Sequence, residues 1–193
     1  MYKTPLLSLV ALALLFSSQS CANSSSNPPS TDGAEQTIGD VGLGGIPQQS
    51  AGFEVMKKMV GSWEGELTQF TGNVINTSSE FRMISGGNTI SEKLVEDGVE
   101  MLTTYTDHDG ELVVKHYCAL GTEPVFKVEN VTNNSLSIVV DEAKSGYNPD
   151  NENYVKSITW TIDENDPNRM TVDGAIYMDG KLESNRSIVT RMN

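Results

Sequence analysis

The residues best suited to chemistry lie between residues 112 and 119, where a histidine precedes a cysteine by two positions. His116 and Cys118 are one of two histidines and one of two cysteines in the chain. The pair has three possible uses: a thiol nucleophile with its base, part of a metal site, or the lining of a pocket. A nucleophile needs a base within about 3.2 Å and an oxyanion hole, and a zinc site needs three or four ligands. The sequence offers neither an oxyanion-hole motif nor a ligand cluster, so it favours the lining, and we expect no metal and no cofactor.

The alternation of side chains along a strand predicts where this pair points. Residues two apart on a strand share a face, so Leu112, Val114, His116 and Cys118 lie together on a face without lysine or glutamate. An uncharged face is typical of the interior of a β-barrel. The sequence therefore predicts that His116 and Cys118 face the interior.

Two charged residues from other segments are predicted to join them. Glu92 alternates with Ile90 and Leu94, and Arg186 shares a face with Ile188. Buried charges are costly unless they are paired or hydrated. Glu92 and Arg186 therefore have two possible roles: an internal network that holds the strand register, or recognition of a small polar or anionic ligand.

The elements that position these residues are predicted to be strands. Ten segments have strand-like composition and are separated by turn-forming residues such as Asp-Gly. They are 63–70, 74–84, 89–96, 99–106, 112–119, 125–131, 136–141, 154–162, 170–178 and 182–191. Residues 53–60 have apolar residues at helical spacing, which predicts a short amphipathic helix. Closure of such a meander removes its exposed edges. We therefore predict an all-β fold, a single antiparallel up-and-down β-barrel of about ten strands with a short N-terminal helix.

The first 51 residues have a different composition. Residues 1–20 combine a basic start, an apolar run and small residues, which is typical of an export signal. Residues 21–51 are rich in Ser, Pro and Gly and contain no aromatic residue, which predicts a disordered tether. We expect a signal peptide over 1–20, a tether over 21–51 and a barrel domain over 52–193. Cleavage before Cys21, with lipidation of that cysteine, would anchor the protein to a bacterial envelope membrane. Cleavage after Ala22 would give a secreted protein.

The charge balance excludes one class of partner. The 193 residues contain 26 Asp and Glu against 13 Lys and Arg, a formal net charge of −13. Nucleic-acid-binding domains carry basic patches, so we expect no nucleic-acid partner. Attraction to anionic lipid also requires basic residues, so membrane association would depend on the lipid anchor.

Two stretches resemble a known group of proteins. Gly61-Ser62-Trp63 opens the first predicted strand, and a second stretch reads Lys115-His116-Tyr117-Cys118-Ala119-Leu120-Gly121. Both are similar to a family of uncharacterised bacterial exported proteins with a calycin-like barrel, distantly like lipocalins, fatty-acid-binding proteins and nitrobindins. The resemblance implies that Trp63 closes one barrel end and that Arg191 packs across it in a cation–π contact. Nitrobindins hold haem through a histidine near the C-terminus. Residues 184–191 contain no histidine, so haem is not expected.

These observations lead to one expected function and two alternatives. We expect a lipid-anchored barrel protein that binds a small hydrophobic or anionic ligand in its interior. The candidate pocket residues are Glu92, His116, Cys118 and Arg186. The first alternative is an enzyme that uses His116 with Cys118 or Glu92. The second is a structural envelope protein whose barrel is filled with side chains.

Overall fold

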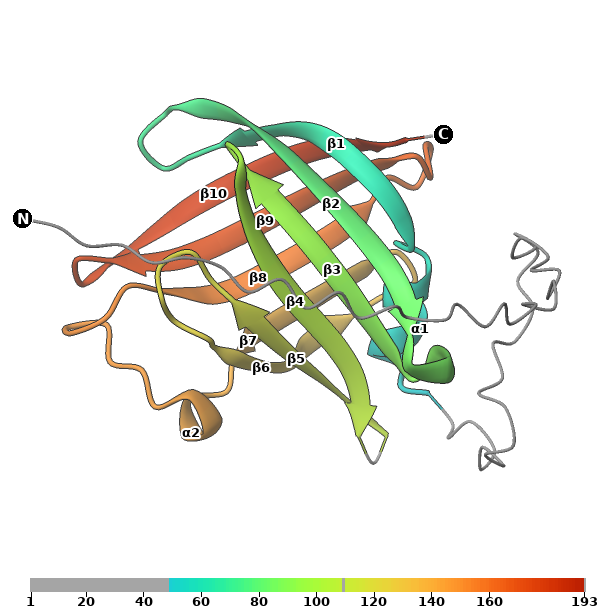
Figure 1. Cartoon of the computed structure of the whole chain (residues 1–193), viewed down its shortest axis with the longest axis horizontal. Coiled ribbons are helices and arrows are strands. Elements are labelled where there is room, and N and C mark those ends of the chain that lie inside the picture. Colours follow the sequence, from blue (N-terminus) through green and yellow to red (C-terminus); the bar gives the residue numbers. More distant parts are fainter. Residues whose placement is uncertain (1–48, 109, 193) are drawn as a thin grey trace, which may run out of the picture. The chain divides into compact units, whose positions relative to one another are not determined.

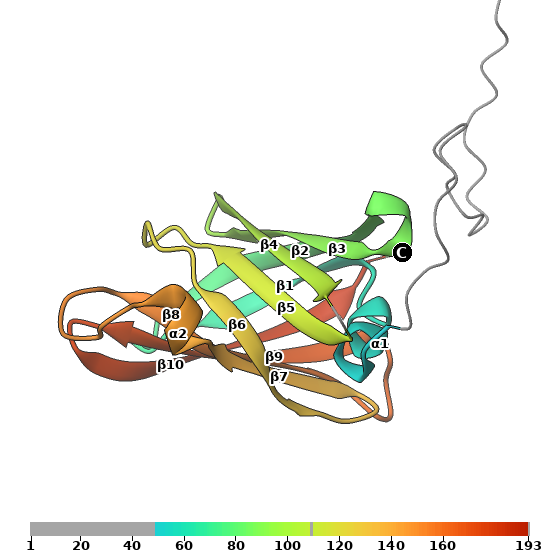
Figure 2. The ribbon, with the colours of Figure 1, turned by 90° about the horizontal axis from the view of Figure 1, so that it is seen from below.

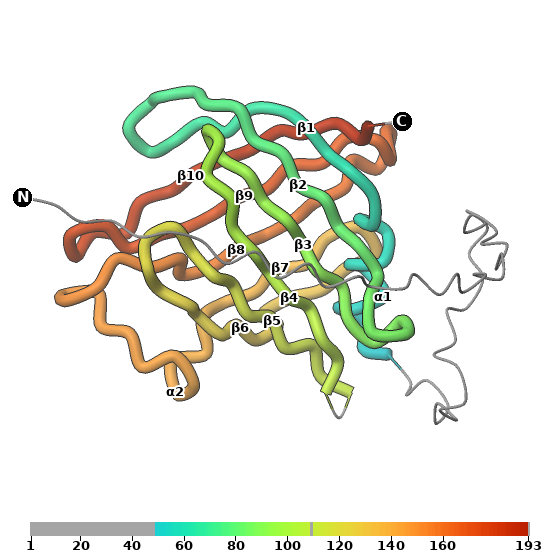
Figure 3. Tube along the Cα trace, viewed as in Figure 1, coloured from blue at the N-terminus to red at the C-terminus, as the bar shows by residue number. Residues whose placement is uncertain are grey.

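The barrel closes through sequential antiparallel pairing. The computed structural model describes residues 49–108 and 110–192. The predicted signal segment, most of the predicted tether and Cys21 lie outside these residues. Ten strands pair in the closed order β1-β10-β9-β8-β7-β6-β5-β4-β3-β2, so each strand lies beside its neighbours in sequence. Figure 1 and Figure 3 show this continuous path around the barrel. The predicted antiparallel up-and-down barrel with a short N-terminal helix is confirmed.

The observed elements lie close to the predicted ones. The helix α1 spans Ala51–Lys57 and begins two residues before the predicted start. The strands are β1 (Gly61–Thr68), β2 (Val74–Ile84), β3 (Thr89–Glu96), β4 (Val99–His108), β5 (Glu111–Tyr117), β6 (Val125–Val131), β7 (Ser135–Val140), β8 (Tyr154–Ile162), β9 (Arg169–Met178) and β10 (Lys181–Arg191). Two short helical turns, η1 (Ser85–Gly87) and α2 (Glu142–Ser145), lie in the connections.

The Asp-Gly pairs form tight hairpins for a local reason. At Asp97-Gly98 the two φ angles are 47° and 81°, and at Asp179-Gly180 they are 51° and 76°. Positive φ at both central residues is the requirement of a type I′ turn, whose twist matches that of the flanking strands. These turns therefore connect β3 to β4 and β9 to β10 directly.

The helix α1 closes one end of the barrel, as Figure 2 shows. Its first turn is capped by Ser50, whose Oγ accepts a hydrogen bond of 3.2 Å from the Phe53 amide. Phe53 and Met56 from the helix and Met59 just after it are fully buried in the core. Within the described residues, no helix combines the length and the apolar character that crossing a membrane requires.

Trp63 and Arg191 meet at this closed end. The Trp63 side chain is fully buried, and its Nε1 donates to the Met59 carbonyl at 2.8 Å. The Arg191 guanidinium lies 4.2 Å from the Trp63 ring centroid. It also donates at 2.7 Å to each of the carbonyls of Val60 and Lys58. One arginine therefore joins the last strand to the segment between α1 and β1.

Candidate functional site

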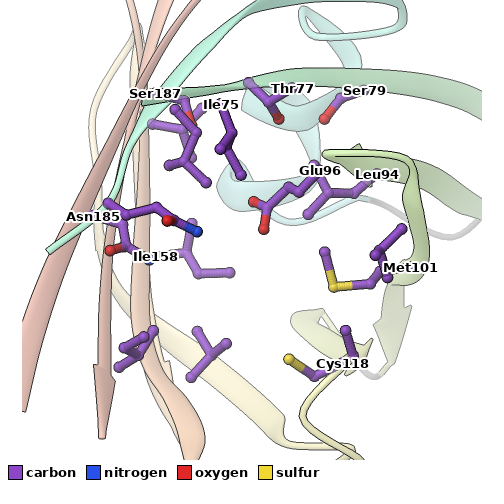
Figure 4. Close-up of a pocket in the computed structure, with 18 of the residues that line it drawn as sticks. Ile75, Thr77, Ser79, Leu94, Glu96, Met101, Cys118, Ile158, Asn185 and Ser187 are labelled. Atoms are coloured by element: carbon purple, nitrogen blue, oxygen red, sulfur yellow. The ribbon is translucent and has the colours of Figure 1, made fainter. Parts of the chain in front are cut away.

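A cavity of about 700 Å³ occupies the half of the barrel opposite α1. Strands β1 to β5 and β8 to β10 form its wall. The β1–β2 turn, the β3–β4 turn and the β5–β6 connection also line it, so the mouth lies at the end of the barrel where these connections are. Figure 4 shows side chains converging on this space from several strands. Small-molecule sites have volumes of about 300–1,000 Å³. The cavity is therefore of a size that suits a small ligand.

An aromatic layer separates the cavity from the filled half of the barrel. The rings of Phe81 and Tyr105 lie 6.2 Å apart, and those of Tyr105 and Trp160 lie 5.7 Å apart, centroid to centroid. Trp160 lines the cavity, whereas Phe81 and Tyr105 belong to the core behind it. Most of the wall is apolar, including Leu67, Leu94, Met101, Ile158, Met170 and Val172.

Three of the four predicted pocket residues line the cavity: Glu92, His116 and Cys118. Glu92 is 4% exposed and His116 is 3% exposed, whereas Cys118 is half-buried with a free thiol. Leu112 and Val114, which share the strand face of His116, are also buried. The inward face of β5 is thus the one that the alternation predicts.

The prediction for Arg186 was wrong, because this residue lies on the outside of the barrel. Its side chain is 64% exposed, and its Nε donates to Asp173 Oδ1 at 2.6 Å. The anionic ligand suggested by the sequence depended on this arginine lying inside. That suggestion therefore loses its basis.

The reason for this error is that β10 carries apolar side chains on its outer face and polar side chains on its inner face. Leu182 and Ile188, which share a face with Arg186, are themselves 56% and 44% exposed. The polar residues Asn185 and Ser187 line the cavity instead. An argument from hydrophobicity therefore selects the wrong face of this strand.

Glu92 sits at the centre of a hydroxyl network. Ser79 Oγ donates to Oε1 at 2.7 Å, and the Tyr105 hydroxyl donates to Oε2 at 2.5 Å. Burial raises the pKa of Glu92, while hydrogen bonds from Tyr105, Ser79 and Thr103 oppose that rise. Both carboxylate oxygens thus have partners within the protein.

His116 is held in its uncharged form. Its Nδ1 lies 2.9 Å from Thr103 Oγ1, on the neighbouring strand β4. Burial lowers the pKa of His116 to about 4, because a desolvated imidazolium is unfavourable. The imidazole is therefore neutral at pH 7.

The His116 and Cys118 pair lacks the properties of a catalytic dyad. A reactive cysteine has a lowered pKa, as an adjacent cation or a helix N-terminus would produce. Burial instead raises the pKa of the Cys118 thiol, and the charge of Glu96 raises it further. The hydrogen bond of His116 Nδ1 goes to Thr103 rather than to the thiol. The arrangement suits a pocket wall. Within residues 49–108 and 110–192, His, Cys, Asp and Glu do not form a group of three or more that could hold a metal ion.

The sequence reasoning missed Glu96, which lies four positions after Glu92 and on the same face of β3. Figure 4 shows its carboxylate projecting into the cavity. Burial raises the pKa of Glu96, and the nearby charge of Glu92 raises it further. The same parity that placed Glu92 inside could have found Glu96.

Asn185 is a second residue that the sequence reasoning missed, and it joins the β1–β2 turn at the mouth to strand β10 of the cavity wall. Its Oδ1 accepts a hydrogen bond of 2.9 Å from the Phe70 amide in the β1–β2 turn. Phe70 and Asn73 of that turn also line the cavity. This contact therefore holds one side of the mouth in place.

Comparison with known proteins gives only distant structural likenesses. The chain matches no protein-family model and no curated protein. It is similar to a redesigned beta barrel, b11L5F_LGL, with 12% identity, 75% of this chain and 97% of that chain covered, and a TM-score of 0.36. It is also similar to EF1p2_mFAP2b bound to DFHBI, with 14% identity, 73% of this chain and 99% of that chain covered, and a TM-score of 0.39. A third similar structure is the redesigned beta barrel mFAP1 bound to DFHBI, with 14% identity, 74% of this chain and 100% of that chain covered, and a TM-score of 0.37. The calycin likeness therefore remains a resemblance between sequence motifs.

Proposed function

We propose that this protein binds a small, partly apolar ligand inside its barrel. The observation that carries the proposal is the cavity of about 700 Å³ in a barrel whose opposite half is filled. The apolar wall faces solvent through the mouth, and transfer of apolar surface from water to an apolar environment is favourable. A ligand with an apolar body would cover that wall. The apolar wall with a few polar groups is typical of a small-molecule site.

We also propose that the barrel is of the calycin type. The contact between Trp63 and Arg191 at the helix-closed end supports this assignment. The Gly61-Ser62-Trp63 motif and the His116 segment support it independently.

An exported, lipid-anchored location is a further part of the proposal. Its support comes from the composition of residues 1–51 and from the position of Cys21. Ser50 is fixed to the barrel by hydrogen bonds from its amide and hydroxyl to the Asp107 carboxylate. The described part of the chain therefore begins at the closed end, opposite the mouth.

Gly174 on β9 offers a direct test of binding. It lines the cavity, and a Cβ added there would meet no atom within 4 Å. Gly174→Leu should place four carbons in the cavity and leave the fold intact. Titration of the full chain with N-phenyl-1-naphthylamine, a neutral apolar fluorophore, should show saturable binding. We expect Gly174→Leu to weaken it at least about tenfold, since even one misplaced methylene in an apolar pocket has that effect.

Gly174→Ala is the matched control, because it adds one methyl group and leaves most of the cavity free. It should bind the fluorophore like the unmodified protein. If the unmodified protein does not bind, or if Gly174→Leu binds equally well with an unchanged Tm, the cavity is not the binding site. A purely structural role for the barrel would then be favoured.

A further inference from the structure

We infer that the ligand carries a protonated amine on an apolar body, and that Glu96 receives the amine. This inference rests on the proposed binding function and specifies its ligand class. It starts from a carboxylate that projects into the cavity without a partner. The remaining polar groups of the cavity then define what the ligand must supply.

Glu96 lacks a counter-charge. In the described part of the chain, no cation and no hydrogen-bond donor contacts its carboxylate, and its electrostatic neighbour is the like-charged Glu92. A desolvated carboxylate is unfavourable unless it is paired. Burial raises the pKa of Glu96, and the charge of Glu92 raises it further. An ammonium group beside Glu96 would compensate both effects.

Glu92 and Glu96 differ in what they offer a ligand. Both oxygens of Glu92 already accept hydroxyl protons, from Ser79 and Tyr105. Glu92 therefore contributes negative potential rather than a free contact. Glu96 is the carboxylate that remains available.

The cavity contains no positive charge that could receive an anion. Its ionisable lining residues are Glu92, Glu96, Asp97, His116 and Cys118, and no lysine or arginine lines it in the part of the chain that the structure describes. The whole chain has a formal net charge of −13. Such a field attracts cations to the mouth and repels anions.

His116 provides a second polar group. Its Nδ1 lies 2.9 Å from Thr103 Oγ1, and the other ring nitrogen of a neutral imidazole either accepts or donates a hydrogen bond. Nε2 of His116 has no hydrogen-bond partner among the described residues. Every fully buried polar side-chain atom in that part of the chain has a partner, so Nε2 is not fully buried. Since His116 lines the cavity and is 3% exposed, Nε2 must face the cavity.

The test compares three probes that share one apolar body. They are 1-naphthylmethylamine, 1-naphthylmethanol and 1-naphthoic acid, titrated calorimetrically into the full chain at pH 7. A charge-assisted hydrogen bond contributes enough for about a tenfold or greater gain in affinity. We expect the amine to bind at least about tenfold more tightly than the alcohol, and the acid to bind most weakly.

Three variants assign this preference to Glu96. Glu96→Gln keeps the shape and removes the charge, so the amine should bind only as well as the alcohol. Glu96→Asp keeps a carboxylate and should keep a preference for the amine. Glu64→Gln removes the same charge from an exposed position on β1 and should leave the preference unchanged. Thermal unfolding of each variant verifies that it is folded.

The outcomes separate this inference from the proposed function. Equal binding of amine and alcohol to the unmodified protein, or a preference that survives in Glu96→Gln, overturns the amine assignment and leaves cavity binding standing. If none of the three probes binds and N-phenyl-1-naphthylamine does not bind either, both proposals are overturned.

Discussion

At the scale of single residues, the cavity shows how burial changes ordinary side chains. Burial raises the pKa of Glu92 and of Cys118 and lowers that of His116, so in each case it favours the uncharged form. Hydrogen bonds donated by the hydroxyl groups of Ser79 and Tyr105 partly compensate the burial of the Glu92 carboxylate. The chemistry of these residues is thus set by their neighbours on adjacent strands rather than by residue type.

The pKa of His116 predicts a loss of stability in acid. Its folded value of about 4 lies below the ordinary value of 6.5. The neutral form is therefore favoured by folding, and this contribution is complete above pH 6.5. It declines as the pH falls from 6.5 to 4, because the unfolded chain then binds a proton that the folded chain does not. The total effect is on the order of 3 kcal/mol.

Urea unfolding of the unmodified protein and of His116→Gln at several pH values between about 7 and 4 measures this effect. The carboxylates titrate in both proteins, so the difference in their free energies of unfolding isolates the histidine. The variant should lose less stability than the unmodified protein. Parallel losses in the two proteins would contradict the burial of a neutral imidazole.

At the scale of elements, the seam between β1 and β10 closes the barrel and depends on a small residue. Gly65 pairs with Val189 across this seam. A Cβ at Gly65 would lie 2.0 Å from the Ile188 carbonyl oxygen, which is backbone and cannot rotate away. The close approach of β1 and β10 at this position therefore requires a residue without a side chain.

Gly65→Ala should destabilise the barrel by about 2 kcal/mol or more, the range for overpacking. The matched control is Gly174→Ala, where the added methyl group meets no atom within 4 Å. The free energy of unfolding in urea should fall for the first variant and stay within about 0.5 kcal/mol for the second. Equal stability of the two variants would mean that the seam tolerates a side chain.

The closed end makes a second prediction at this scale. Trp63→Ala should lower the free energy of unfolding by about 3–5 kcal/mol, the range for truncating a buried large aromatic residue. It also removes the surface on which the Arg191 guanidinium packs. Leu182→Ala is the control, because Leu182 is 56% exposed. A Tm for Trp63→Ala as high as that of Leu182→Ala would show that Trp63 does not support the barrel end.

At the scale of the whole molecule, one end of the barrel is built for stability and the other for access. The helix α1, Trp63 and Arg191 close the end where the described chain begins. Turns between strands surround the mouth at the other end. If the chain is tethered to a membrane through Cys21, the closed end is the end nearer to the anchor in sequence.

Replacement of Cys21 tests this arrangement. Cys21→Ser removes the thiol that lipidation requires, so the protein should leave the membrane fraction or accumulate as an unprocessed precursor. Fractionation of cells that express the full chain, followed by mass measurement of the N-terminal peptide, provides the readout. Normal processing and an unchanged membrane-bound fraction in the variant would exclude a lipid anchor at this cysteine.

Features of this protein that depend on neighbours along the chain could be predicted from the amino-acid sequence. The Asp97-Gly98 turn needs positive φ at two successive residues, and alternation along β5 places His116 on an uncharged face. These are local constraints, so they can be read without a structure. The antiparallel meander follows from them, because tight turns return each strand beside the previous one.

The inward face of β10 and the set of groups that share the cavity depend on contacts between strands that are distant in sequence. Asn185 rather than Arg186 faces the interior, because closure against β1 and β9 orients the whole strand. Glu96 became recognisable as an unpaired carboxylate only when the residues around it were known. Burial and pairing depend on residues distant in sequence, and a ligand-holding barrel can carry polar residues inside and apolar residues outside. Hydrophobic pattern alone therefore does not determine the lining of this cavity.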